Sequence, residues 1–190
     1  MSRLTITPDD RPGQPDFISE NATEIAARLA PLAVSFERWQ SPVAIGPDDA
    51  PDAILAAYRP HLDALMGQSL MGQSLMGESG AGSADVIKLT PDHPQAAALR
   101  AKFLQEHRHT EPEIRFFVAG SGNFILHVNG FVYDVKCTEG DLIGVPAGIP
   151  HWFDAGPAPD FTALRVFTDT TGWVPHFTGS DISTRFPASE

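Results

Sequence analysis

A chain of 190 residues is long enough for one domain with a full hydrophobic core, and its 42% hydrophobic content argues against general disorder. Its formal net charge of -11 argues against binding to nucleic acid or to an anionic membrane surface, because both need basic patches. Cys137 is the only cysteine, so no intramolecular disulfide can form, and no apolar run approaches membrane-spanning length. Because the N-terminus also lacks a signal-peptide pattern, we expect a cytoplasmic protein. We further expect a monomer that binds neither nucleic acid nor membrane.

The N-terminal part is expected to contain an arm, a helix and a strand. Residues 1–16 are rich in proline and polar residues, which predicts a loosely held arm with a short strand at Leu4–Ile6. Asn21 and Glu24 resemble a capping box, and apolar residues follow them at helical spacing. Apolar and polar residues then alternate over residues 34–39, which predicts a strand.

A second helix is expected to begin at Pro51, because a first-turn proline preceded by Asp48 and Asp49 favours a helix start. Its apolar residues follow at helical spacing. They are Ile54, Leu55, Tyr58, Leu62 and Leu65.

A pentapeptide, Leu-Met-Gly-Gln/Glu-Ser, then occurs in three copies between Leu65 and Ser79. A step of five residues turns a helix by about 140°, so the copies cannot share one helical face. In a strand, an odd period would place them on alternating sides. Since each copy contains glycine and serine, we expect residues 65–83 to form a flexible loop. The alternative is a methionine-rich adhesive or metal-binding surface.

The rest of the chain is predicted to be mostly β. A strand is expected at residues 86–89 and a helix at residues 94–105, followed by short strands and turns. Asn129-Gly130 is the preferred two-residue hairpin turn. If residues are counted outward from this turn along both strands, apolar residues pair with each other on one face of the hairpin. The opposite face carries His127. Several short antiparallel strands at this spacing indicate a closed barrel or jelly roll.

Four residues between positions 107 and 151 are the candidate metal ligands. His107 and His109 point to the same side of an extended chain, so both imidazoles can reach one cation. Glu113 can add a carboxylate oxygen and His151 a third imidazole, a donor set that suits a divalent transition metal. Glu111 is the rival carboxylate, because Pro112 breaks regular strand geometry and strand parity cannot choose between the two.

The remaining histidines have no such context. His61 lies on the second expected helix, His93 lies in a proline-rich turn, and His176 has no partner at a suitable spacing. His127 lies on the polar face of the hairpin. We therefore interpret these four as residues that bind no metal.

The four candidates lie inside two longer patterns. His-x-His-x3-Glu-x6-Gly and Gly-x5-Pro-x-Gly-x2-His resemble the two cupin motifs, except that Ala101 and Ala155 replace their usual first glycine and last asparagine. The longer strings FLQEHRHTEPEIRFFVAGSGNFILHV and DLIGVPAGIPHWFDAG resemble the acireductone dioxygenase family. This resemblance implies a mainly β fold over residues 1–190, a cupin-type double-stranded β-helix (jelly-roll barrel) with a few flanking α-helices. It also favours Glu113 over Glu111.

The resemblance further implies a function. Members of that family cleave an acireductone, 1,2-dihydroxy-3-keto-5-methylthiopentene, with O2 in methionine salvage. One Fe(II) or Ni(II) ion per chain is expected, held by His107, His109, Glu113 and His151. Iron gives formate and 2-keto-4-methylthiobutyrate, whereas nickel gives methylthiopropionate, formate and carbon monoxide, so the sequence does not decide the products.

Five further residues are expected to contact the substrate or take part in catalysis. By strand parity, Arg115 shares the side of Glu113, where its charge can hold an anionic enediolate. Arg165 is the second candidate catalytic residue, and its alternative role is a salt bridge or a surface position. The resemblance suggests that Phe103, Phe153 and Trp173 form an apolar wall.

Two other function classes fit the same fold. One is a different metal-dependent cupin enzyme, such as a zinc-type sugar-phosphate isomerase, but a phosphate substrate would need more convergent basic residues than the two arginines found. The other is a non-catalytic cupin that binds or stores a ligand. Such proteins often lose metal ligands, whereas all four are present here.

Overall fold

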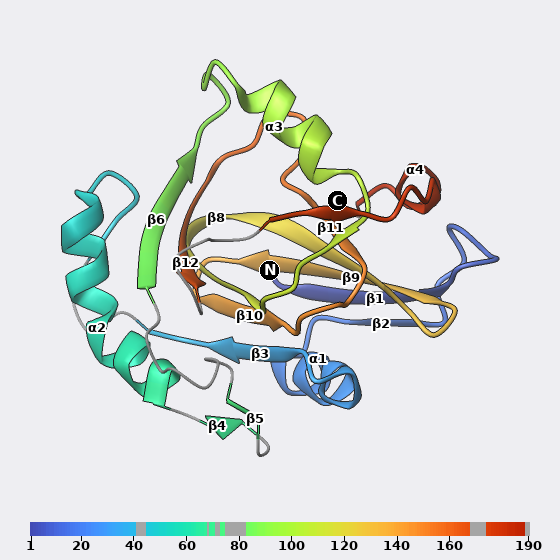
Figure 1. The fold of residues 1–190 in the computed structure, drawn as a ribbon, viewed down its shortest axis with the longest axis horizontal. Helices are drawn as coiled ribbons and strands as arrows, with labels where there is room; N and C mark the ends of the chain where they lie inside the picture. Colours follow the sequence, from blue (N-terminus) through green and yellow to red (C-terminus); the bar gives the residue numbers. More distant parts are fainter. Residues whose placement is uncertain (41–44, 68, 71–72, 75–82, 168–173, 189–190) are drawn as a thin grey trace.

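The computed structural model describes residues 1–40, 45–67, 69–70, 73–74, 83–167 and 174–188, and it contains two facing sheets (Figure 1). The first sheet has the order β13 (His176–Phe177), β7 (His107–Arg108), β11 (His151–Asp154), β8 (Glu113–Val128), β9 (Phe131–Thr138), β1 (Arg3–Pro8), β2 (Phe17–Ser19). The second has the order β3 (Ser35–Arg38), β10 (Asp141–Val145), β8, β12 (Phe161–Phe167), β6 (Ser83–Leu89). The paired strands are antiparallel, and the expected jelly-roll architecture is confirmed.

Strand β8 belongs to both sheets because it is long and changes direction. Its first half pairs with β10 and β12, and its second half pairs with β9 and β11. At the corner, Gly120 has a φ of +74°, and a Cβ atom there would lie 2.0 Å from the carbonyl oxygen of Asp160. Only glycine fits such a close approach, which explains why this position of the motif is a glycine.

The predicted hairpin between β8 and β9 is confirmed. Asn129 and Gly130 have φ values of 53° and 79°, as a type I′ turn requires, and Val128 pairs with Phe131. The apolar face of this hairpin joins the core between the sheets. Its opposite face packs against the C-terminal helix α4 (Ile182–Arg185).

The other helices cover edges and outer faces of the barrel. Helix α1 (Ala22–Leu29) runs into the 3-10 helix η1 (Ala30–Leu32), α2 is Pro51–Gly67, and α3 is Ala96–Phe103. Helix α2 packs on the outward side chains of β8, β10 and β12 through Ile54, Tyr58, Leu62 and Leu65, as its spacing predicted. Among the described residues, no helix has the length and apolar character needed to cross a membrane.

The N-cap of α1 confirms one half of the predicted capping box. The side chain of Asn21 accepts hydrogen bonds from the backbone nitrogens of Thr23 and Glu24. The Glu24 side chain, however, accepts from the Ser19 hydroxyl, whose oxygen in turn accepts from the Asn21 nitrogen. Ser19 therefore mediates the contact that the motif normally makes directly.

The expectation of a loosely held N-terminal arm is wrong for the residues of β1, although the short strand expected at Leu4–Ile6 is present. The N-terminal arm contains β1, which lies between β9 and β2, and its Leu4 side chain is fully buried. In the repeat, Leu65 is a buried residue of α2, and β4 (Ser69–Leu70) pairs with β5 (Gln73–Ser74). The rest of the repeat lies outside the described residues.

Candidate metal centre

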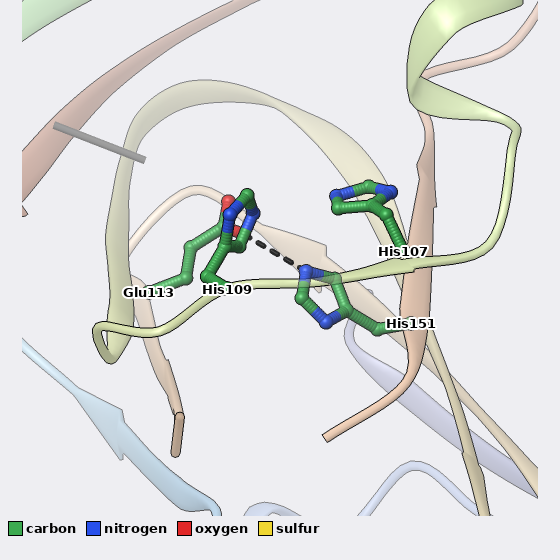
Figure 2. Close-up of side chains that lie close together, drawn as sticks. All are labelled: His107, His109, Glu113 and His151. Atoms are coloured by element: carbon green, nitrogen blue, oxygen red, sulfur yellow. Dashed lines mark hydrogen bonds and ion pairs between the residues drawn. The ribbon is translucent and has the colours of Figure 1, made fainter. Parts of the chain in front are cut away.

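Four side chains from three neighbouring strands converge inside the barrel. His107 begins β7, Glu113 begins β8 and His151 begins β11, while His109 directly follows β7. Figure 2 shows the three imidazoles and the carboxylate turned toward a common space. One potential ligand atom from each residue lies within 4.8 Å of the others, and the four side chains are buried. The structure therefore brings together the four residues that the sequence predicted.

Each imidazole is oriented by a backbone carbonyl. The Nδ1 atoms of His107, His109 and His151 donate to the carbonyl oxygens of Gln105 at 2.7 Å, Val174 at 3.0 Å and Ile149 at 2.8 Å, respectively. These hydrogen bonds place a proton on each Nδ1 and direct each Nε2 inward. Metal-binding histidines in proteins are oriented in the same way, so the site fits a bound cation.

The carboxylate of Glu113 lies at the centre of this cluster. Its Oε2 atom is 3.0 Å from Nε2 of His151 and 3.2 Å from Nε2 of His109. Although burial raises the pKa of Glu113, hydrogen bonds from these two histidines and the charge of Arg115 hold it well below its ordinary value. Glu113 therefore offers an anionic oxygen next to three imidazole nitrogens, which is a donor set for a divalent transition metal.

The pKa values of His107 and His109 are shifted in opposite directions. Burial, reinforced by the charge of His151, lowers the pKa of His107 to about 4, so this imidazole is neutral at neutral pH. Burial also disfavours the charged form of His109, but the hydrogen bond and charge of Glu113 outweigh it and raise the pKa of His109. A neutral imidazole is the form that binds a metal.

Arg115 lies beside the metal centre, as strand parity predicted. Its side chain is buried, and Nη2 donates to Oε1 of Glu113 at 2.9 Å. The guanidinium carbon lies 4.5 Å from the ring centroid of Phe153 and 5.2 Å from that of Phe124. Burial lowers the pKa of Arg115, whereas the charge of Glu113 favours its protonated form. The site thus pairs a buried cation with the carboxylate that faces the three histidines.

Arg165 lines the same cavity but makes a salt bridge. Its Nε and Nη2 atoms donate to the two carboxylate oxygens of Asp85 at 2.8 and 2.6 Å. Both side chains are partly exposed. The salt bridge that was the alternative for Arg165 is therefore present, in addition to the predicted position facing the cavity.

A cavity of about 280 Å³ adjoins the four candidate ligands. Phe103 and Phe153 line it, with ring centroids 6.3 Å apart in an edge-to-face arrangement. Trp173, the third aromatic residue expected here, lies outside the described residues. Five lining residues were missed by the sequence analysis: Ile87, Leu99, Lys102, Phe167 and Pro175.

A sequence signal existed for some of these missed residues. Leu99, Lys102 and Phe103 share one helical face at i, i+3 and i+4. Phe167 has the strand parity of Arg165.

The rejected candidates do not belong to this cluster, although His176 on β13 pairs with Arg108, between His107 and His109. Among the described residues, no other cluster of histidine, cysteine and acidic side chains has metal-site geometry, and Glu111 is not part of the one found. His127 lies instead between Glu106 and Asp9, at 2.9 and 3.1 Å. The regular strand β8 begins at Glu113, two residues after Glu111.

Comparison with known proteins agrees with this geometry. The model of the ARD/ARD′ family matches residues 7–175. Acireductone dioxygenases of Acidiphilium cryptum and Granulibacter bethesdensis are 60% and 59% identical over 189 residues, covering 100% of this chain and 99% and 100% of theirs. A solved acireductone dioxygenase from Bacillus anthracis, with a cadmium ion in its active centre, is similar at a TM-score of 0.76 and 27% identity, covering 93% of this chain and 98% of that one. The chain belongs to the ARD/ARD′ family, the acireductone dioxygenases.

Proposed function

We propose that this chain cleaves the acireductone 1,2-dihydroxy-3-keto-5-methylthiopentene with O2 at a single divalent metal ion. The observation that carries the proposal is the convergence of three inward-facing Nε2 atoms on the Glu113 carboxylate, with Arg115 beside it. In a six-coordinate site, four protein ligands leave two positions open. An enediolate has two adjacent oxygens that suit such a pair of positions.

We assign His107, His109, Glu113 and His151 as the ligands of one Fe(II) or Ni(II) ion. When bound, the ion supplies Lewis acidity and a template for the substrate oxygens. The same donor set accepts either metal. The proposed products are formate and 2-keto-4-methylthiobutyrate with iron, or methylthiopropionate, formate and carbon monoxide with nickel.

The other side chains orient the substrate. Arg115, buried among aromatic rings, offsets the negative charge of the enediolate, because a guanidinium in a low-dielectric site binds an anion strongly. Phe153 and Phe103 form an apolar wall for the methylthioethyl tail. Arg165 adds positive charge at the cavity and is oriented by Asp85. The resemblance to the family also assigns Trp173 to this wall.

The cellular context follows from the same proposal. The reaction belongs to methionine salvage, and we place the enzyme in the cytoplasm as a monomer with one domain over residues 1–190. The single cysteine supports the cytoplasmic placement, and a length of 190 residues suits one domain.

Metal analysis followed by oxygen consumption tests the proposal. The purified protein is stripped of metal, reloaded with Fe(II) or Ni(II), and supplied with synthetic acireductone under O2. We expect one ion per chain, O2 uptake in both forms, and carbon monoxide from the nickel form only. A protein that binds the ion but consumes no O2 with this substrate would instead be a ligand-binding cupin or a different cupin enzyme.

A further inference from the structure

Helix α3 forms one wall of the cavity and packs against the core through Ala96, Leu99 and Phe103. Leu99, Lys102 and Phe103 line the cavity from this helix. Within α3, which the structure describes completely, Ala96 alone is buried, and Gln95 at the N-cap makes no side-chain capping hydrogen bond. Because an eight-residue helix is marginal without tertiary contacts, the position of α3 depends on the contacts it makes with the barrel.

One of these contacts is a two-pronged ion pair with β11, the strand on which α3 packs (Figure 1). Nε and Nη2 of Arg100 donate to the two carboxylate oxygens of Asp154 at 2.8 and 2.9 Å. The Asp154 side chain is 7% exposed and also accepts from the nitrogen of Gly156, so its position is well defined. Its partner Arg100 is one-third exposed.

The ion pair connects the two aromatic walls of the cavity. Asp154 directly follows Phe153, and Arg100 lies one helical turn before Phe103. Phe103 of α3 and Phe153 of β11 are in edge-to-face contact, so this ring contact and the ion pair both join α3 to β11. Without the Arg100 guanidinium, the buried Asp154 carboxylate would lose its partner, and the favoured response is a shift of α3 that admits water.

We propose that Arg100 is a positioning residue that holds α3 against β11 and so sets the width of the apolar subsite for the substrate tail. The inference rests on the proposed function and adds a determinant of substrate specificity to it. The four candidate metal ligands and Arg115 lie on or beside β7, β8 and β11, not on α3. Arg100 therefore affects recognition of the tail and leaves the chemical step in place.

The kinetic test compares two substrates. Arg100→Ala should raise KM for the full acireductone by about tenfold, the effect of losing about 1.4 kcal/mol of binding, while kcat stays within about twofold. An acireductone with a methyl group in place of the methylthioethyl tail should show a nearly unchanged KM. Arg100→Lys should recover part of the loss, because an ammonium group keeps the charge but not the two-pronged geometry.

Arg59→Ala is the matched control. Arg59 lies on α2 and makes an exposed ion pair with Asp63 at 3.9 Å. This substitution removes the same type of side chain at a distance from the cavity. The KM for each of the two substrates should therefore equal that of the parent protein. If Arg100→Ala leaves KM for the full substrate unchanged, or lowers kcat equally for both substrates, Arg100 does not set the subsite.

Amide hydrogen exchange tests the same inference without turnover. Exchange across residues 96–103 should become about tenfold faster in Arg100→Ala and stay unchanged in Arg59→Ala. A parent protein that does not turn over acireductone contradicts the proposed function, whereas the exchange experiment still tests the placement of α3. Equal exchange in α3 of the parent and Arg100→Ala would contradict the positioning role.

Discussion

At the scale of single residues, the candidate centre is organised by backbone carbonyls. The three Nδ1–H groups donate to carbonyl oxygens of Gln105, Ile149 and Val174, so backbone geometry directs each Nε2 inward. Such orientation limits the reorganisation that metal binding requires. Loss of one imidazole should therefore weaken the whole set.

Replacing His107 or His151 by alanine should lower the metal content well below one ion per chain and abolish O2 consumption. Each substitution removes one nitrogen donor from a four-residue set. Metal analysis after equilibration with one equivalent of ion measures the effect. His93→Ala, in a turn away from the cluster, should keep full metal content, and full occupancy in both site variants would contradict the assignment.

Arg115→Ala should keep its metal and lose turnover. A protonated guanidinium cannot bind a cation, but it can donate to an anionic substrate. The loss of one charge-assisted hydrogen bond should remove about 1.5–3 kcal/mol of transition-state stabilisation. This loss corresponds to a decrease in kcat/KM of roughly tenfold to more than a hundredfold. Metal titration and steady-state kinetics measure both properties. Arg115→Lys should recover part of the activity, and a variant that fails to bind metal would assign Arg115 to the fold.

Cys137 should be unreactive in the folded protein. Burial raises the pKa of its thiol well above the ordinary value of 9.0, and its side chain is fully buried. Thiol reagents at pH 8 should modify it only after unfolding. Because the neutral thiol is favoured in the folded state, stability present below pH 9 should decrease at higher pH. Cys137→Ala should show a smaller decrease, and rapid modification of the native protein would contradict its burial.

At the scale of elements, β8 divides its side chains between two environments. Glu113, Arg115 and Phe117 point into the barrel, while Ile114 and Phe116 pack against α2. Strand parity at Glu113 therefore places the carboxylate and the guanidinium on the side of the cavity. A shift of register by one residue would exchange these sets and remove the site.

The repeated pentapeptide should contribute unequally to stability. Leu65, in the first copy, is buried against the outer face of the second sheet, so Leu65→Ala should lower the free energy of unfolding by about 2–5 kcal/mol. Deleting residues 75–79, the third copy, should change it by well under about 1 kcal/mol, because the cost of loop closure grows slowly with length. Activity should survive the deletion. Denaturant unfolding compares the two variants, and a large loss on deletion would mean that the third copy packs on the core.

At the scale of the whole molecule, a bound ion should cross-link strands of the barrel. Its proposed ligands lie on or directly beside β7 and β8, which follow each other in the chain, and β11, where His151 is 38 residues beyond Glu113. Because the unfolded chain lacks this arrangement, the ion should stabilise the folded state alone.

Removing the ion with a chelator should therefore lower the melting temperature. At a free metal concentration of about 100 times Kd, the ion adds about 2.7 kcal/mol to the free energy of unfolding. For a protein of this size, that raises the melting temperature by roughly 5–11 °C. Calorimetry with and without chelator measures the difference. His107→Ala should show little change on chelation, and an equal change in both proteins would mean that the chelator acts elsewhere.

Several features could be predicted because they depend on neighbours in the chain. The hairpin at Asn129-Gly130, the N-cap at Asn21 and the parity of Arg115 with Glu113 follow from local backbone geometry. The choice between Glu111 and Glu113 could not be made from residues alone, because Pro112 breaks regular strand geometry and the sequence does not show where the strand begins. The start of β8 at Glu113 supplies that information.

The amino-acid sequence by itself determined several strands and helices, among them the β8–β9 hairpin, and which four side chains are candidates for a metal, because turn chemistry, periodicity and ligand spacing act over a few residues. The tertiary structure decided what surrounds them. It inserted β1 between β9 and β2, paired Arg165 with Asp85, and joined Arg100 to Asp154. The β1–β9, Arg165–Asp85 and Arg100–Asp154 contacts link residues from about 50 to more than 130 positions apart. Since such pairing depends on how the sheets close around one core, no local pattern encodes it.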